Sequence, residues 1–172
     1  IDSILLITIG NHEKEIDKRM EISLLEIMNL YLHKNTGKEI FISNHYAGFI
    51  RVLLSENSRN ASCVIFYNHG KDGNATMSFG VLNVKRNASV IDADIFISGH
   101  VHRNYSLPLN RIGLTQQNSI IIKEQLHIQL GTSKETIGTD YFSARKGFDP
   151  ASNSMFYIDF TCTLFKIIKI PS

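Results

Sequence analysis

Three short apolar runs in this sequence each lead into a polar cluster that contains glycine and histidine. The runs and their clusters are Ile4–Ile9 with Gly10-Asn11-His12-Glu13, Ser62–Tyr67 with Asn68-His69-Gly70, and Ala93–Ser98 with Gly99-His100-Val101-His102. Runs of this length predict strands, and a run that is apolar throughout is typical of a strand buried on both faces. Because ligands of α/β proteins bind just beyond the carboxyl ends of strands, these clusters form the candidate functional site.

The rest of the pattern predicts one long helix and further strands. Apolar residues recur three or four apart between Glu13 and Leu32, which predicts a single amphipathic helix, whereas Met77–Val84 fits either a short helix or an ordered loop. Further strands are expected at Glu39–Ser43, Phe49–Leu54, Ile120–Ile122, Leu126–Leu130, Phe156–Phe160 and Thr163–Ile170, the last four of them antiparallel. The three prolines, Pro108, Pro150 and Pro171, are placed in loops or at the chain end. We therefore predict one α/β domain over residues 1–172, with sheets packed on each other and helices outside.

The composition narrows the class of protein. Hydrophobic residues make up 43% and charged residues 20%, with a net charge of +2, which excludes a disordered chain and a strongly basic nucleic-acid-coating protein. No apolar run approaches the roughly 20 residues that span a bilayer, so we expect no membrane partner. Cys63 and Cys162 form no metal or redox motif and are expected to be buried free thiols. With no secretory signal visible, this favours a reducing compartment, and we expect a cytoplasmic protein.

Four of the seven histidines lie in the strand-end clusters: His12, His69, His100 and His102. A lone histidine at a strand end is more often a hydrogen-bonded residue than a ligand, but the same placement at three strand ends favours a metal site. His-x-His can direct two imidazoles to one metal or to two adjacent metals. The other three histidines fit structural roles at a helix end, in a turn and in a strand: His33, His45 and His127.

Taken in order, the three clusters resemble the last three motif blocks of the calcineurin-like metallophosphoesterase superfamily. The apolar stretch Asp94–Ser98 before the Gly-His-x-His block also resembles that family. Gly131-Thr132-Ser133, Tyr141 and Lys146–Pro150 resemble, more weakly, the variable C-terminal part of its bacterial and phage members. The resemblance implies a four-layer α-β-β-α sandwich with mixed sheets. It also implies a metal-dependent phosphoester hydrolase that uses a dinuclear metal centre and a histidine general acid.

Two motif blocks of that family are not present in this sequence. The family opens with Gly-Asp-x-His, which supplies ligands to one metal, and a second Gly-Asp supplies the carboxylate that bridges both metals. No Gly-Asp dipeptide occurs in the 172 residues, and the expected place for both blocks lies before Ile1. We therefore expect the chain to be the C-terminal portion of such a domain, truncated at its N-terminus, rather than a divergent complete member.

The resemblance implies metal ligands at four positions. Asn11, through its side-chain carbonyl, and His69 and His100 would coordinate one metal, and His102 would coordinate the other. The cofactors would be two divalent ions of Mn, Fe, Zn or Ni. One imidazole cannot hold the second ion, so the chain alone is expected to bind one metal weakly or none and to show negligible catalysis.

The resemblance also implies two roles in the reaction with the substrate. His12 would face the substrate phosphate and protonate the leaving alkoxide. Glu13 would orient His12 and favour its protonated form, the alternative being an ordinary residue of the first helical turn. From its place directly after the Gly-His-x-His block, Arg103 could bind the substrate phosphate, as could Lys71 after His69-Gly70, the alternative for both being a solvated loop charge.

The substrate and two rival functions stay open. The partner would be a phosphoester, with nucleic acid and nucleotides among the candidates, and the tail favours a phosphodiesterase or nuclease. A net charge of +2 neither requires nor excludes nucleic acid. The first rival is a non-catalytic scaffold with the same fold, in which substitutions at Asn11, His12 or His100 would be expected. The second rival is a single-metal binding protein, which explains the histidines but not Asn11-His12-Glu13.

Overall fold

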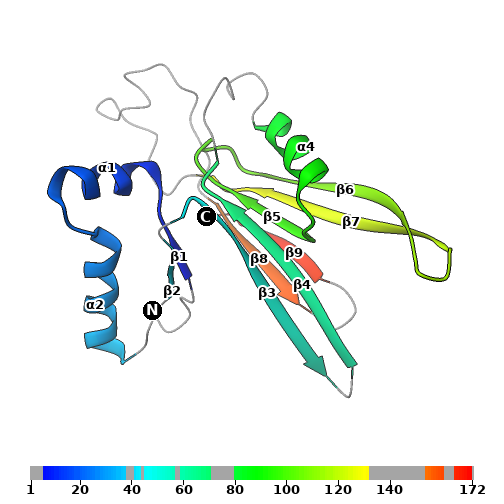
Figure 1. Ribbon diagram of the computed structural model, residues 1–172, viewed down its shortest axis with the longest axis horizontal. Helices are drawn as coiled ribbons and strands as arrows, with labels where there is room; N and C mark the ends of the chain where they lie inside the picture. Colours follow the sequence, from blue (N-terminus) through cyan, green and yellow to red (C-terminus); the bar gives the residue numbers. More distant parts are fainter. Residues whose placement is uncertain are drawn as a thin grey trace. The chain divides into compact units, whose positions relative to one another are not determined.

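The computed structural model describes residues 6–37, 41–43, 45–56, 59–70, 80–131, 154–160 and 165–171 (Figure 1). The chain divides into two compact units, Ile1–Gly48 and Phe49–Ser172. Helices occur together with parallel and antiparallel strand pairs, which confirms an α/β protein with mixed sheets. A single domain over residues 1–172 stays a prediction. Among the helices of the described part, none is both long and apolar enough to span a bilayer.

The first unit contains two strands and two helices: β1 Leu6–Thr8, α1 Asn11–Met20, α2 Leu24–Thr36 and β2 Phe41–Ser43. β1 pairs with β2 in parallel, and Ile9, directly after β1, is 1% exposed. The unit therefore leads from a short parallel strand straight into α1, whose first residue is Asn11.

The prediction of one helix from Glu13 to Leu32 is wrong, because the helix is interrupted after Met20. Glu21 has φ 53°, in the left-handed region, and ends α1. The hydroxyl of Ser23 accepts a hydrogen bond from the amide of Glu26 at 3.3 Å and caps α2. The carboxylate of Asp17 accepts one from the amide of Leu24 at 3.0 Å. Side chains thus satisfy first-turn amides of α2, which allows a new helix to begin there.

The described part of the second unit contains a five-stranded sheet, a helix and a two-stranded sheet. The elements are β3 Ala47–Glu56, β4 Arg59–Asn68, α4 Val81–Val90, β5 Ile95–Ser98, β6 Tyr105–Leu114, β7 Ile120–Gln129, β8 Ser154–Phe160 and β9 Phe165–Pro171. The order of strands in the larger sheet is β3-β4-β5-β7-β6. β5 pairs in parallel with β4 on one side and with β7 on the other, whereas β6 is antiparallel to β7.

Two sequence predictions are corrected in this unit, and one open assignment is decided for its described residues. β6 was not predicted, and Pro108, expected in a loop, lies within it opposite Leu126. Because β6 is the last strand of the described sheet, a residue without an N–H is tolerated there. The runs 120–122 and 126–130 belong to one strand, β7, which is antiparallel only to β6. The ambiguous segment Met77–Val84 leads into α4, which begins at Val81, and residues 71–79 lie outside the described part.

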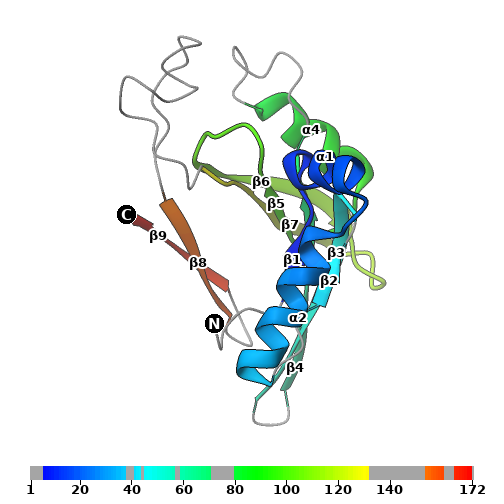
Figure 2. The same cartoon turned by 90° about the vertical axis from the view of Figure 1, so that its left-hand side faces the viewer.

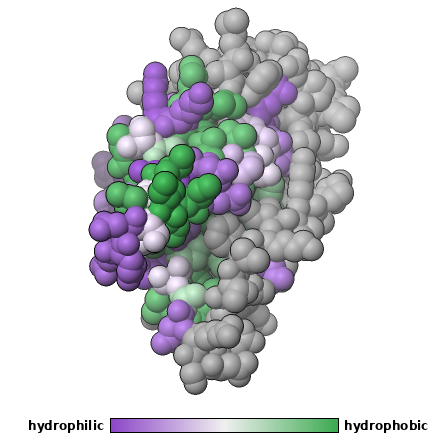
Figure 3. All heavy atoms as spheres, turned by 90° about the vertical axis from the view of Figure 1, so that its right-hand side faces the viewer, coloured by the Kyte–Doolittle hydropathy of each residue, from purple (hydrophilic) through white to green (hydrophobic). Residues whose placement is uncertain are grey.

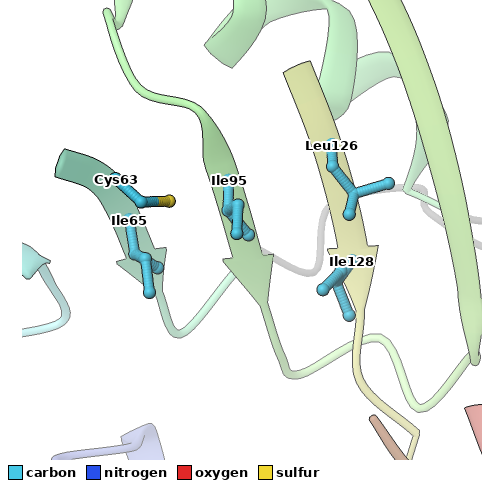
Figure 4. Close-up of a cluster of buried hydrophobic side chains, with 5 residues drawn as sticks. All are labelled: Cys63, Ile65, Ile95, Leu126 and Ile128. Atoms are coloured by element: carbon cyan, nitrogen blue, oxygen red, sulfur yellow. The ribbon is translucent and has the colours of Figure 1, made fainter. Parts of the chain in front are cut away.

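One face of the large sheet carries the main apolar core. Cys63 and Ile65 of β4, Ile95 of β5, and Leu126 and Ile128 of β7 form it (Figure 4). Phe156, Ile158 and Phe160 of β8 pack against this cluster, so the small sheet covers this face (Figure 2). Cys63 is a free thiol, as predicted, and burial raises its pKa to about 11, with Asp94 adding to the effect. Cys162 lies outside the described residues.

The opposite face of the large sheet is aromatic. Phe66 lies 5.1 Å from Phe49 and 5.9 Å from Phe96 between ring centroids, and Phe96 stacks on His127 at 4.2 Å. His127 is 2% exposed, and its Nε2 has no hydrogen-bond partner among the described residues. Burial without a partner disfavours the charged imidazole and lowers the pKa of His127 to about 4. The structural role predicted for His127 is confirmed.

The hairpin of β6 and β7 ends in an exposed apolar group of four residues: Ile112, Leu114, Ile120 and Ile122, which are 78%, 69%, 76% and 65% exposed. Ile112 pairs with Ile122 and Leu114 with Ile120, so each pair shares one face of the hairpin. Figure 3, which faces this end of the hairpin, shows apolar side chains gathered there among polar ones. The opposite end, where Tyr105 pairs with Gln129, adjoins the candidate site described below.

His127 predicts how the stability of the protein depends on pH. The unfolded chain takes up a proton at its ordinary pKa of 6.5, whereas the folded chain binds it only near pH 4. The free energy of unfolding contributed by this group should therefore fall between those values, by roughly 3 kcal/mol in total. Urea unfolding at pH 7.5 and pH 4.5 should show a smaller loss for His127→Gln than for the wild type.

The exposed His33 provides the matched control for this experiment. His33→Gln removes an imidazole by the same substitution, and the loss of stability on acidification should stay that of the wild type. An equal pH dependence for His127→Gln and the wild type would contradict the assignment of the effect to His127.

Candidate metal centre

The two histidine clusters of the second unit emerge at the same edge of the sheet. β4 and β5 are parallel and in register, with Asn68 opposite Ser98 at their carboxyl ends. His69 follows β4 directly, and His100 is two residues beyond β5. The amide of Gly99 donates to the carbonyl of Asn68 at 3.2 Å, so the two turns stay joined beyond the strands. The predicted placement of both clusters at strand ends is confirmed.

Glycine at two positions lets the turns approach closely. Gly70 has φ +89°, and a Cβ added there would lie 2.5 Å from the carbonyl oxygen of Gly99 and 3.3 Å from Cβ of His100. A Cβ on Gly99 would lie 3.3 Å from the carbonyl oxygen of His69. A side chain at Gly70 would push the two backbones apart, so this glycine serves the contact between the turns.

His69 and His100 meet through their ring nitrogens. His69 Nε2 and His100 Nδ1 are 3.0 Å apart, and one nitrogen donates while the other accepts. The ring centroids are 4.9 Å apart at an interplanar angle of 62°. Two imidazole nitrogens bound at right angles to one ion, each at about 2.0–2.1 Å, would lie about 3 Å apart. The separation of the two nitrogens therefore matches that of two ligands on one divalent metal ion.

The loop that follows β5 has an unusual backbone. His100 and His102 have φ 70° and 57°, in the left-handed region that costs a non-glycine residue about 1–2 kcal/mol. Strain of this kind persists only where the surrounding structure enforces it, and it is enriched at functional sites. His102 is exposed and Arg103 half-buried. The predicted role of His102 at a second metal and that of Arg103 toward phosphate stay predictions.

The third cluster lies in the first unit, at the start of α1. Asn11 and His12 are exposed in the first turn of the helix, directly beyond β1. The carboxylate of Glu13 accepts a hydrogen bond from the amide of Gly10 at 3.2 Å and thus caps its own helix. This contact favours the reading of Glu13 as a residue of the first helical turn. The roles of Asn11 as a ligand, of His12 as an acid and of Glu13 in orienting His12 stay predictions.

The described residues bring together two histidine side chains, not a larger set of possible metal ligands. Among them, no group of three or more His, Cys, Asp or Glu side chains is arranged to hold a metal ion. The candidate centre is therefore built on His69 and His100.

Gln129 at the end of β7 was missed in the sequence. Its Nε2 donates to the carbonyl oxygens of Gly99 at 2.7 Å and of Ser98 at 3.1 Å, and the residue is 3% exposed. One pattern could have revealed it: Gln125, His127 and Gln129 recur at every second position of an otherwise apolar strand. Polar residues on one buried face need hydrogen-bond partners, and here one partner is the loop that carries His100.

Comparison of the chain with family models, with curated protein sequences and with solved structures found no match. The likeness to metallophosphoesterases thus rests on the motif residues themselves. The geometry of His69 and His100 is an observation independent of that likeness, because it follows from the register of β4 and β5.

The approach of the two turns predicts the effect of a methyl group at Gly70. Gly70→Ala combines a left-handed backbone with a contact of 2.5 Å to a carbonyl oxygen, whereas Gly37→Ala has φ +69° and nothing within 4 Å. Gly37→Ala should lower the free energy of unfolding by about 1 kcal/mol, the strain alone. Gly70→Ala should cost clearly more in urea unfolding and should also shift the imidazole NMR signals of His69 and His100. Equal costs, with unshifted imidazole signals, would contradict the close approach.

Proposed function

We propose that this chain is part of a metal-dependent phosphoester hydrolase, of the phosphodiesterase or nuclease kind. The observation that carries the proposal is the 3.0 Å distance between His69 Nε2 and His100 Nδ1 at the carboxyl ends of two parallel strands. It supports a shared divalent metal ion, because both nitrogens are ligands of the type that Mn, Fe, Zn and Ni accept. The order of the three motif clusters supports the phosphoester chemistry.

The proposed ligand set assigns the side chains to two ions. As the order of the motif clusters assigns them, His69, His100 and Asn11 would hold the first ion, and His102 would belong to the second. When bound, the two ions would neutralise charge on the ester phosphate and activate water as the nucleophile. A second ion with one imidazole lacks an adequate cage, and this sequence contains no Gly-Asp dipeptide to supply a carboxylate. For the chain as it stands we therefore propose weak binding of one ion.

The remaining roles concern protons and phosphate. His12 gives the proton of a ring nitrogen to the leaving alkoxide. An unprotonated alkoxide is a poor leaving group, so this proton transfer speeds cleavage of the ester bond. Arg103 binds the phosphate of the ester through its guanidinium group. Glu13 supports His12 indirectly, since it caps the helix on which His12 stands.

The fold and location form part of the same proposal. In the second unit, the core cluster places the small sheet against one face of the large sheet, and α4 lies on the other side (Figure 2). This helix–sheet–sheet order is compatible with a four-layer α-β-β-α sandwich, which we propose for the domain over residues 1–172. We also propose a cytoplasmic location.

A single-metal binding protein without hydrolase activity is the second candidate. It is favoured by the finding that the described residues gather a pair of imidazoles but no larger group of His, Cys, Asp or Glu. The two candidates differ in His12, which has a role only if an ester is cleaved.

Metal binding is tested by titrating the chain with Co²⁺ and following the absorption of the bound ion in the visible range. The wild type should bind Co²⁺, and His100→Ala should weaken binding by at least about tenfold, because it removes one nitrogen of the pair. His33→Ala, on the exposed surface of α2, is the control and should bind like the wild type. Equal affinities for the wild type and His100→Ala would refute the proposed centre.

Hydrolysis is tested by measuring diester cleavage in the presence of Mn²⁺ by the protein that the complete reading frame around this chain encodes. His12→Ala should lower kcat about a hundredfold for a diester with an alkoxide leaving group, because that group needs a proton. The same variant should lose far less with bis(p-nitrophenyl) phosphate, whose leaving group departs unprotonated. An equal loss with both substrates would contradict the acid role of His12, and metal binding without hydrolysis of either substrate would favour the single-metal candidate.

A further inference from the structure

Gln129 holds the turn that precedes His100. Its side-chain amide donates to the carbonyl oxygens of the two residues before His100, which are Gly99 at 2.7 Å and Ser98, the last residue of β5, at 3.1 Å. The carbonyl of Ser98 also accepts from the amide of Leu130 at 2.8 Å, and that of Gly99 from the amide of Val101 at 2.9 Å. Gln129 and Leu130 therefore hold Ser98 and Gly99 by one backbone and two side-chain hydrogen bonds.

The carbonyl oxygen of Gly99 lies at the point of closest approach between the turn after β4 and the turn after β5. It is the group closest to the missing side chain of Gly70, at 2.5 Å from the position of an added Cβ. Gln129 makes the shortest of its side-chain hydrogen bonds to this same oxygen. A rotation of the peptide after Gly99 would change the separation of the turns, and with it the contact between His69 and His100.

The backbone of His100 needs an external restraint. Its φ of 70° lies in a region that a non-glycine residue adopts only when the surroundings enforce it. Gln129 supplies such a restraint from a neighbouring strand, since its amide is bound to the residue directly before His100. Because Gln129 is only 3% exposed, water does not compete with its hydrogen bonds.

We propose that Gln129 is a positioning residue for the metal centre, which presents His100 Nδ1 to His69 Nε2 through the carbonyl of Gly99. This inference rests on the proposed function, because it assigns Gln129 to the metal site that function requires. Residues that orient metal ligands through hydrogen bonds typically change metal affinity about 10–100-fold when they are replaced. Gln129 acts through the backbone and touches neither metal nor substrate.

The same strand offers a matched control in Gln125. Gln125 lies on the same face of β7, is likewise 3% exposed, and donates from Nε2 to a carbonyl before β5, that of Ala93 at 3.0 Å. Gln125 thus repeats the burial and the type of hydrogen bond at the opposite end of β5. Gln125 lies farther along the strand from the loop that carries His100 than Gln129 does.

The experiment compares Gln129→Met with Gln125→Met, each close to isosteric and without a donor. Backbone amides still satisfy Ser98 and Gly99 in the first variant, so we expect it to fold. Both variants should lose similar thermal stability. Only Gln129→Met should bind Co²⁺ at least about tenfold more weakly than the wild type. In the metal-free protein, only Gln129→Met should shift the ¹⁵N imidazole NMR signals of His69 and His100.

Gln129→Asn provides a second variant if Gln129→Met does not fold. It keeps the amide but shortens the side chain by one methylene group, so the amide no longer reaches Gly99. It should show the same selective loss of Co²⁺ affinity and the same imidazole shifts.

Each outcome decides for or against the positioning role. Equal loss of Co²⁺ affinity in the variants at positions 125 and 129 would overturn it and leave Gln129 a residue of general stability. A wild type that binds no Co²⁺ would refute the proposed function, and the imidazole signals of the metal-free protein would then decide on Gln129. Signals shifted by replacement of Gln129 and unshifted in Gln125→Met would support the positioning role, whereas signals unshifted in both would refute it.

Discussion

The close approach of two turns, after β4 and after β5, is the constraint on which the candidate centre depends. Parallel strands in register bring their carboxyl ends to one edge of the sheet, and the hydrogen bond from Gly99 to Asn68 continues the pairing by one step. The missing side chain of Gly70 leaves room for the carbonyl of Gly99. Because the backbones are held at this distance, two imidazoles that are 31 residues apart in the sequence come within hydrogen-bonding reach.

The core fixes the register that this edge requires. β4, β5 and β7 share one apolar face, formed in part by Ile65, Ile95 and Ile128 (Figure 4). The small sheet packs on this face through Phe156 and its neighbours on β8. The opposite face of β7 is polar and buried, which is unusual, and its side chains bind carbonyls at both ends of β5. Apolar packing on one face and hydrogen bonding on the other therefore hold β5 between its neighbours.

Local pattern in the sequence predicted the three strands that end in histidine clusters, because an apolar run that ends at a polar cluster is a local property, but it did not predict β6. The distance between His69 and His100 could not be predicted, since it depends on the register of strands about 30 positions apart. The break between α1 and α2 depends on a cap by Ser23 that competes with a continuous helical pattern. Pro108 was misplaced because its tolerance in β6 follows from the position of that strand in the sheet.

The central claim is that His69 and His100 ligate one metal ion, and crystallography with anomalous scattering tests it most directly. Crystals grown with Mn²⁺ and measured at a wavelength where manganese scatters anomalously should show a peak within bonding distance of both His69 Nε2 and His100 Nδ1. Anomalous peaks elsewhere only, with the two nitrogens still in direct contact, would contradict the account.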